Sequence, residues 1–380
     1  MDFVSKTLFS LKKFLASASS QSVLGLDIGT SSIKVVQLKR EKEWAVLETY
    51  GEISLSPYGN VDIGRAVKPT NEKLIEAIKD IIKEANIKAK RTAVSIPLKS
   101  SFVTVIQVPD LEEKEISEVI KMEARKYIPI PISEVIIDWW IFPEDDLKGE
   151  DSVSEAPSDS GGESKKTRKF IKVLLVAIHK NIIGEYKKII SSCGLELSKF
   201  EIESFGVIRS ILARETSPVA IVDFGASSTK IAIVDFGIMK SAYTISQGSQ
   251  DITLALSKSL GVDFKKAEEI KREVGLSKMP EHKEIVSIMT PFLDYVFSEA
   301  KSVIMDYQRK NKQVVTRAIL TGGGAMLKGI ADLAIKNLNM ETSLAEPFSK
   351  TEYPAFLEGA LKEAGLSFSV AVGLALGDLQ

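Results

Sequence analysis

A chain of 380 residues is longer than one ordinary hydrophobic core, and its length predicts about two domains. Hydrophobic residues make up 44% of the chain and charged residues 27%, which is typical of a globular protein, and a net charge of −1 argues against nucleic-acid binding. The single cysteine, Cys193, excludes an internal disulfide, and two histidines, His179 and His282, exclude a histidine-rich metal site. No apolar run approaches the roughly eighteen residues that a membrane-spanning helix needs.

Residues 1–21 form a leader in which apolar side chains recur at helical spacing. Lys12 and Lys13 interrupt its apolar stretch, which argues against a secretory signal peptide. Two interpretations stay open. The leader is either a mobile or body-docked segment, or a short amphipathic helix that lies on anionic lipid.

The next segments alternate between strand and helix patterns. Residues 23–28 and 33–38 predict a hairpin, 45–53 a third strand, and 72–85 a helix with one apolar stripe. Strands closed by prolines, a helix from the capping box at 110–113 to about Tyr127, and further strands at 135–142 and 170–178 are then expected. Residues 143–169 are rich in Ser, Gly and charged side chains, so they predict a disordered insertion.

Two short stretches repeat each other nearly two hundred residues apart: LDIGTSSIKV at 26–35 and VDFGASSTKI at 222–231. Such a match indicates a duplicated unit rather than two unrelated turns. The residues that recur in register are Asp27/Asp223, Gly29/Gly225, Ser31/Ser227, Ser32/Ser228 and Lys34/Lys230.

Each repeat has the chemistry of a phosphate-binding turn. A hairpin of small residues presents backbone N–H groups, and the hydroxyls of Thr30, Ser31 and Ser32 add donors. Asp27 and Asp223 are suited to hold Mg²⁺ through water, because Mg²⁺ keeps part of its hydration shell. Two such hairpins facing each other would hold one polyphosphate.

A third loop, Gly322–Gly323–Gly324, lies between a predicted strand and a predicted helix start within 318–330. Glycines let the backbone approach a flat ligand, and a helix N-terminus favours an anion. The three loops in this order predict nucleotide binding.

The order of hairpin, insertion, second hairpin and glycine-rich turn resembles the actin, heat-shock-protein-70 and sugar-kinase superfamily from about residue 22 to the end. The resemblance implies an α/β actin-like (ribonuclease-H-like, duplicated) fold, with two lobes around a cleft for ATP or ADP and Mg²⁺. It places the phosphate contacts on the two hairpins, although Ala226 stands where many members have glycine. It places a conserved acid of the connecting helix at Glu203, a ribose-contacting pair at Glu268 and Lys271, and the adenosine loop at 322–326. The nucleotide-contacting residues that the resemblance implies are Asp27, Gly29, Thr30, Ser31, Ser32, Lys34, Asp223, Gly225, Ala226, Ser227, Ser228, Thr229, Glu268, Lys271, Gly322, Gly323, Gly324 and Met326.

Three further stretches resemble the PilM family, the actin-like cytoplasmic proteins of bacterial type IV pilus and type II secretion machines. They are the leader before GLDIGTSSIKVVQL, the segment MEARKYIPIPISEVIIDW at 122–139, and SVAVGLAL at 369–376. The resemblance implies an inserted small α+β subdomain whose border binds the cytoplasmic N-terminal tail of PilN, an inner-membrane protein. An aromatic residue, an arginine and apolar side chains beside a proline-fixed turn suit peptide capture. These candidate contacts are Ala124, Arg125, Tyr127 and Ile128.

The domain organisation that follows from both resemblances has six parts. They are a leader at 1–21, a first lobe at 22–90, the inserted subdomain at 91–195, a connecting helix of the first lobe at 196–215, a second lobe at 216–365, and a closing helix at 366–380 that packs on the first lobe.

The function expected from the PilM resemblance is that of an ATP-binding scaffold at the inner-membrane assembly platform. Its partners would be PilN, the platform and assembly ATPases, and it would be cytoplasmic, reaching the membrane peripherally or through partners. Hydrolysis would be slow or absent, with Glu203 and Asp223 as candidates to orient water or Mg²⁺. Two alternatives remain: a small-molecule kinase of the same superfamily, and a filament-forming division protein of the FtsA kind.

Overall fold

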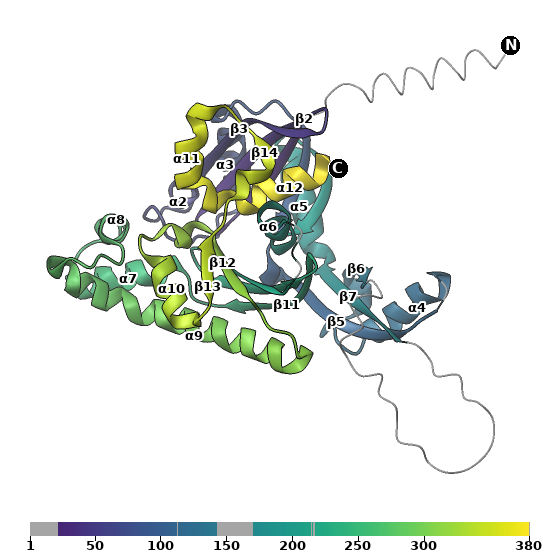
Figure 1. Cartoon of the computed structure of the whole chain (residues 1–380). Coiled ribbons are helices and arrows are strands. Elements are labelled where there is room, and N and C mark those ends of the chain that lie inside the picture. Colours follow the sequence, from purple (N-terminus) through teal and green to yellow (C-terminus); the bar gives the residue numbers. More distant parts are fainter. Residues whose placement is uncertain (1–21, 112, 143–169, 214, 216, 380) are drawn as a thin grey trace, which may run out of the picture. The chain divides into compact units, whose positions relative to one another are not determined.

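The computed structural model describes residues 22–111, 113–142, 170–213, 215 and 217–379 (Figure 1). The leader and the insertion at 143–169 lie outside the described residues, and so do the predictions made for them. The chain divides into two compact units. Unit 1 takes the described residues of Met1–Ser95, Ile189–Leu212 and Ala345–Gln380, and unit 2 takes those of Ile96–Lys188 and Ala213–Leu344.

Unit 1 is built on a six-stranded sheet with the order β14-β3-β2-β1-β4-β8. Its interior strand β1 pairs antiparallel with β2 and parallel with β4, and every residue of β1 is buried. A strand covered on both faces is apolar along its whole length, which explains the run in which Asp27 is the one charged residue. The strands are β1 (Val23–Ile28), β2 (Ser32–Glu41), β3 (Trp44–Ser54), β4 (Arg91–Ile96), β8 (Glu196–Ile202) and β14 (Thr351–Glu352), and the helices are α2 (Ser56–Gly59), α3 (Asn71–Glu84), α6 (Glu203–Ile211), α11 (Glu358–Ala364) and α12 (Ser369–Leu379).

The helix predicted at 72–85 is confirmed as α3. The side chain of Thr70 caps it by accepting a hydrogen bond from the backbone N–H of Lys73. Its buried residues, Leu74, Ala77, Ile78 and Ile81, recur at the spacing of one helix face, so that face covers the sheet of unit 1.

The closing helix α12 packs on β1 and α6 through glycines. A Cβ on Gly25 of β1 would overlap the carbonyl oxygen of Ala371, and a Cβ on Gly373 would overlap that of Gly206. Close backbone approach of this kind needs residues without side chains. The run Ala355–Leu379 is long and apolar enough to cross a membrane by composition, but 61% of its most apolar window is buried, as expected for a core helix of a globular unit.

Residues after Leu344 return to unit 1, which corrects the predicted second lobe of 216–365. The short strand β14 pairs in parallel with β3. Beside it, the ring of Tyr50 meets those of Phe348 and Phe368, with centroids 6.1 Å and 5.5 Å away. Aromatic packing at these distances joins the C-terminal segment to the first sheet.

Unit 2 contains a five-stranded sheet with the order β11-β10-β9-β12-β13 and a three-stranded sheet with the order β5-β7-β6. The first sheet is made of β9 (Val219–Phe224), β10 (Thr229–Asp235), β11 (Ile238–Ile245), β12 (Arg317–Thr321) and β13 (Glu341–Leu344). The helices of this part are α7 (Ser249–Leu260), α8 (Phe264–Val274), the 29-residue α9 (Lys283–Asn311), and α10 (Ile330–Leu338).

The smaller sheet of unit 2 forms the inserted subdomain. It consists of β5 (Ser101–Pro109), β6 (Val135–Ile141) and β7 (Phe170–His179), together with α4 (Glu113–Ala124). The helix α5 (Lys180–Ser192) follows β7, and the boundary between the two units falls within α5. Apolar side chains of α4 and of one sheet face share a core centred on Ile120 and Leu175. A cation–π contact joins this part to the five-stranded sheet: Lys240 of β11 places its Nζ 4.2 Å from the ring centre of Phe142.

Two boundaries of the inserted subdomain are corrected by the strand pairing. Residues 91–96, predicted to open it, form β4 beside β1 in the sheet of unit 1. Residues 196–202, predicted as the start of the connecting helix that follows it, form β8 beside β4 in the same sheet, and the helix α6 begins only at Glu203. The helix predicted to reach Tyr127 ends at Ala124, because a turn closes there and Pro129 cannot continue the helix.

Candidate functional site

The two repeated hairpins are built in the same way. Gly29 N donates to Ser32 O at 3.1 Å, and Gly225 N donates to Ser228 O at 3.1 Å. A Cβ on Gly29 would lie 2.9 Å from Ser32 O, and a Cβ on Gly225 would lie 2.8 Å from Ser228 O. Both distances are shorter than real Cβ contacts allow. The glycine of each repeat is therefore required by the tightness of its own turn.

The first hairpin holds Asp27 through a serine that the sequence did not identify. Ser95 on the neighbouring strand β4 donates its hydroxyl to Asp27 Oδ1 at 2.8 Å and accepts from Ile28 N at 3.2 Å. One side chain thus positions the carboxylate and satisfies a backbone donor at the start of the turn. No motif marks Ser95, because its role comes from pairing β4 with β1.

Backbone hydrogen bonds from the segments that follow β3 hold the turn of the first hairpin in place. Thr30 O accepts from Val67 N at 2.8 Å, and Ser31 O accepts from Leu55 N at 2.9 Å. Lys34 reaches back to the turn, where its Nζ donates to Ser32 Oγ at 2.7 Å, and it also lies 3.3 Å from Glu52 Oε1. A basic group therefore stands beside the small residues of this turn.

Glu203 belongs to the same unit as the first hairpin. It is the first residue of α6 and is buried, at the helix end whose dipole favours an acid. At the other end of α6, Lys350 Nζ donates to the carbonyl oxygens of Arg209 and Leu212. The helix that carries the predicted acid is thus held at both ends by favourable charges.

In the second hairpin, the structure brings Asp223 and the glycine-rich loop together. A Cβ on Gly322 would overlap Asp223 Oδ1 and lie 2.7 Å from Phe224 O. One on Gly324 would lie 2.7 Å from the ring of Phe224. Gly322 has a φ of 85°, which glycine adopts readily and other residues rarely do. The glycine loop therefore rests on the end of β9, against the predicted carboxylate.

The start of α7 supports the second turn. Ser249 N donates to Gly225 O at 3.0 Å, and Gln250 N donates to Ala226 O at 3.0 Å. A Cβ on Gly248 would overlap Ala226 O, so this segment also approaches the turn at backbone distance. The sequence signal was a glycine in ISQGSQDIT at 245–253, which the spacing of the repeats did not mark.

Glu268 and Lys271 of α8 form a buried ion pair at 2.6 Å that is joined to the same segment. Lys271 Nζ donates to Thr253 Oγ1 at 2.9 Å and to Ser249 O at 3.2 Å, and Thr253 donates to Glu268 Oε2 at 2.6 Å. Ser249 therefore connects the predicted phosphate hairpin to the predicted ribose pair, through its N–H on one side and its C=O on the other.

The surroundings of Glu268 keep it ionised. Burial alone would raise the pKa of Glu268, but the charge and hydrogen bond of Lys271, together with bonds from Thr253 and Arg272, hold the pKa below its ordinary value. Burial lowers the pKa of Lys271, and Glu268 opposes that effect. The pair is therefore charged, buried and held in place by protein partners.

The glycine loop does not open a helix, which corrects one argument for anion binding. Residues Gly323–Met326 form a single 3₁₀ turn, and α10 begins at Ile330 after Gly329, whose φ is 84°. A helix dipole at Gly324 is therefore not available. Met326, the residue predicted to lie near the base, is 41% exposed.

The four residues predicted to capture a partner peptide separate into two pairs. Ala124 and Ile128 are buried in the core between α4 and its sheet. Arg125 and Tyr127 are exposed, Tyr127 by 44%. The first pair therefore packs the subdomain, and only the second pair has side chains available for contact.

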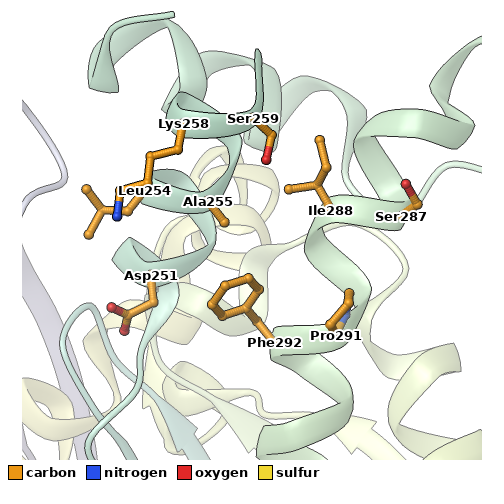
Figure 2. A pocket seen from close by; sticks show the side chains of 9 residues that line it. All are labelled: Asp251, Leu254, Ala255, Lys258, Ser259, Ser287, Ile288, Pro291 and Phe292. Carbon is orange, nitrogen blue, oxygen red and sulfur yellow. The ribbon is translucent and has the colours of Figure 1, made fainter. Parts of the chain in front are cut away.

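A groove of about 510 Å³ lies between α7 and α9 and contains none of the predicted residues (Figure 2). Its apolar lining includes Leu254 of α7 and Ile288 and Phe292 of α9, and Asp251 and Lys258 of α7 also line it. Asp251 Oδ2 accepts from Gly248 N at 2.8 Å, so this carboxylate stabilises the start of α7.

The donors present fit a nucleotide with a magnesium ion held through water. Among the residues that the structure describes, no three His, Cys, Asp or Glu side chains are placed to enclose a metal ion. Asp27 and Asp223 are single carboxylates, and Mg²⁺ held by one or two carboxylates keeps several waters. The glycine turns and hydroxyls beside them are suited to phosphate oxygens.

Comparison with known proteins agrees with the fold. The chain is 24% identical over 366 residues to Cell division protein FtsA of Bacillus subtilis, covering 87% of this chain and 79% of that protein. The FtsA of Pseudomonas aeruginosa is 23% identical over 396 residues, covering 95% and 90%.

Among solved structures, one described as the PilM-PilN type IV pilus biogenesis complex superposes with a TM-score of 0.77 at 22% identity, covering 94% of this chain and 98% of that one. The ethanolamine utilization protein EutJ from Carboxydothermus hydrogenoformans gives 0.53 at 16% identity, covering 93% and 89%. The fold is therefore that of the actin-like ATPases. The sequence profile of Type IV pilus assembly protein PilM matches residues 25–154 and 159–378, and the chain belongs to that family.

Proposed function

We propose that this protein binds ATP or ADP with Mg²⁺ through its two hairpins, its glycine loop and the Glu268–Lys271 pair, and that it serves as a nucleotide-loaded scaffold in pilus assembly. One observation carries the nucleotide part. Ser249 bonds both to Gly225 of the phosphate-type turn and to Lys271 of the pair on α8. Residues predicted from separate motifs are thus connected within one unit.

The roles of the residues follow from their chemistry. The backbone N–H groups and hydroxyls of the turns, with Lys34, would bind phosphate oxygens. Glu268 would accept from ribose hydroxyls while Lys271 keeps it ionised. Asp27 and Asp223 would bind magnesium-bound water, and the ion would neutralise phosphate charge. If water attacks the terminal phosphate, Glu203 and Asp223 are the groups proposed to orient it, and we expect turnover to be slow or absent.

A thermal-shift measurement tests nucleotide binding. A ligand at about 100 times its Kd stabilises the folded state by about 2.7 kcal/mol, which raises the melting temperature by several degrees. We expect that shift with Mg²⁺-ATP for protein freed of co-purified nucleotide, and its loss in Asp27→Ala. No shift in the wild type would mean that the hairpins are only structural.

The proposed partner is the cytoplasmic N-terminal tail of PilN. Membership of the PilM family supports this proposal, together with the exposed Arg125 and Tyr127 on the inserted subdomain. The protein would then be cytoplasmic and reach the inner-membrane platform and the assembly ATPases through partners. Titration with a synthetic PilN tail, with and without Mg²⁺-ATP, tests both binding and nucleotide coupling. If the affinity for the tail is the same with and without Mg²⁺-ATP, the protein binds its partner but nucleotide binding does not control that affinity.

A filament-forming role of the FtsA kind is the second candidate, because several relatives are FtsA proteins. Sedimentation of the full chain with Mg²⁺-ATP distinguishes the two. Nucleotide-dependent pelleting would favour the filament, and soluble protein that binds the PilN tail would favour the scaffold.

A further inference from the structure

Lys230 in the second hairpin pairs with the carboxylate that the proposed function assigns to magnesium. It lies directly opposite Asp223 in the register of β9 and β10, and its Nζ is 3.4 Å from Asp223 Oδ2. Both side chains are partly buried, with 18% and 14% exposed. A contact of this length is a weak hydrogen bond, which a stronger partner can replace.

The ammonium group of Lys230 also stands over the turn. Its Nζ would be 3.8 Å from a Cβ on Gly225, the residue that opens the phosphate-type turn. Asp223 meets the glycine loop with its other oxygen, Oδ1, which a Cβ on Gly322 would overlap. Asp223 therefore contacts Lys230 with one carboxylate oxygen and adjoins the glycine loop with the other. Lys230 in turn lies near both Asp223 and Gly225 of the turn.

The internal repeat gives an independent reason to assign Lys230 a ligand. Lys34 holds the matching place opposite Asp27 in the first hairpin, and its Nζ likewise reaches back to the turn, at Ser32 Oγ. Two lysines at one position of a duplicated hairpin, both directed at the turn, are each suited to a phosphate group.

We propose that Lys230 distinguishes a nucleoside triphosphate from a diphosphate, by exchanging Asp223 for the terminal phosphate. This inference rests on the proposed nucleotide site. A divalent cation near Asp223 would repel the ammonium group and compete for the carboxylate, while a terminal phosphate would supply Lys230 with a stronger charge-assisted bond. A diphosphate offers no such group, so Lys230 would stay with Asp223.

The experiment compares Kd values for ATP and ADP, both with Mg²⁺, for the nucleotide-free wild type, Lys230→Met and Lys230→Arg. Loss of one charged hydrogen bond predicts about tenfold weaker ATP binding by Lys230→Met with ADP binding changed by less than about threefold. Lys230→Arg should keep most of the preference for ATP. Lys258→Met is the matched control, because Lys258 lines the separate groove between α7 and α9.

Three results separate this inference from the function on which it rests. Equal weakening of ATP and ADP by Lys230→Met, or no change in either, would overturn the role of Lys230 while leaving nucleotide binding intact. Failure of the wild type to bind either nucleotide would overturn the proposed function, and this inference with it. Melting temperatures without nucleotide show whether Lys230→Met folds, and if it does not, the ATP-to-ADP ratio of Lys230→Arg decides.

Discussion

Gly373 of α12 lies so close to Gly206 of α6 that a side-chain carbon on Gly373 would overlap the carbonyl oxygen of Gly206. The same helix meets Gly25 of β1 at backbone distance. Because β1 carries Asp27 and α6 carries Glu203, one helix packs on both elements that hold the predicted acids of unit 1.

Gly373→Ala tests this contact. The added methyl group must displace backbone, so we expect a loss of about 2 kcal/mol in the free energy of unfolding. Chemical denaturation measures it. Gly359→Ala is the matched control: Gly359 is also helical, nothing lies within 4 Å of its Cβ position, and the change should be neutral or slightly stabilising. Equal stability of the two variants would contradict the packing described.

Asp378→Asn tests the anchor at the end of α12. Arg91 donates to both carboxylate oxygens of Asp378, at 2.9 Å and 3.0 Å, and Ser198 donates to Oδ2 at 2.8 Å. The carboxylate is buried, so we expect the neutral amide to cost about 1–2 kcal/mol of stability. Glu358→Gln, which removes an exposed pair with Lys362 on the neighbouring helix, should leave the unfolding midpoint unchanged.

Ser95→Ala should weaken both stability and nucleotide binding. Ser95 bonds to Asp27 and to Ile28 N, and its loss leaves two buried polar groups without that partner, at a cost of about 2 kcal/mol. The thermal shift with Mg²⁺-ATP should shrink as well. Ser367→Ala removes one bond to the carbonyl of Ala364 in the same unit and should leave that shift unchanged. An unaltered shift in Ser95→Ala would show that Asp27 does not depend on this serine.

The lowered pKa of Glu268 predicts that the stability of the fold depends on pH in the acidic range. Its folded pKa lies below the ordinary value of 4.5, so its stabilising contribution is complete above 4.5 and is lost as the pH falls through the folded pKa. The Glu268→Gln variant should therefore lose less stability than the wild type when the pH is lowered through that window. At neutral pH it should be less stable by about 3 kcal/mol, because Lys271 is left buried without its partner. Adding Lys271→Met should recover part of that loss.

Tyr127→Ala should weaken binding of the PilN tail without unfolding the subdomain, since Tyr127 is 44% exposed and lies outside the core that Ile128 joins. Ile128→Ala should instead destabilise the inserted subdomain by about 2–3 kcal/mol, because the side chain is buried in its core. Met122→Ala, at an exposed position of the preceding helix α4, is the control for tail binding. Equal tail affinity for Tyr127→Ala and the wild type would remove Tyr127 from the proposed interface.

Local patterns of the sequence were sufficient for the hairpins. The tightness of each turn depends on Gly29 and Gly225, and the recurring Asp and Lys lie opposite each other because an antiparallel hairpin sets their register. The helix stripe of α3 was also visible, because burial of one face leaves a period in the chain, and the closing helix α12 was visible as a run of small apolar residues that is buried almost throughout.

Only the tertiary structure determined which of these segments contact one another. Ser95 reaches Asp27 across 68 positions, Lys271 reaches Ser249 across 22, and strand 91–96 joins the first sheet rather than the inserted subdomain. Ala124 and Ile128 are core residues and Tyr127 is not, although all three lie within five positions of the chain. Periodicity records that a side chain is covered, whereas the identity of the covering group depends on which strands pair and which helices pack, and those contacts are between residues far apart in the chain.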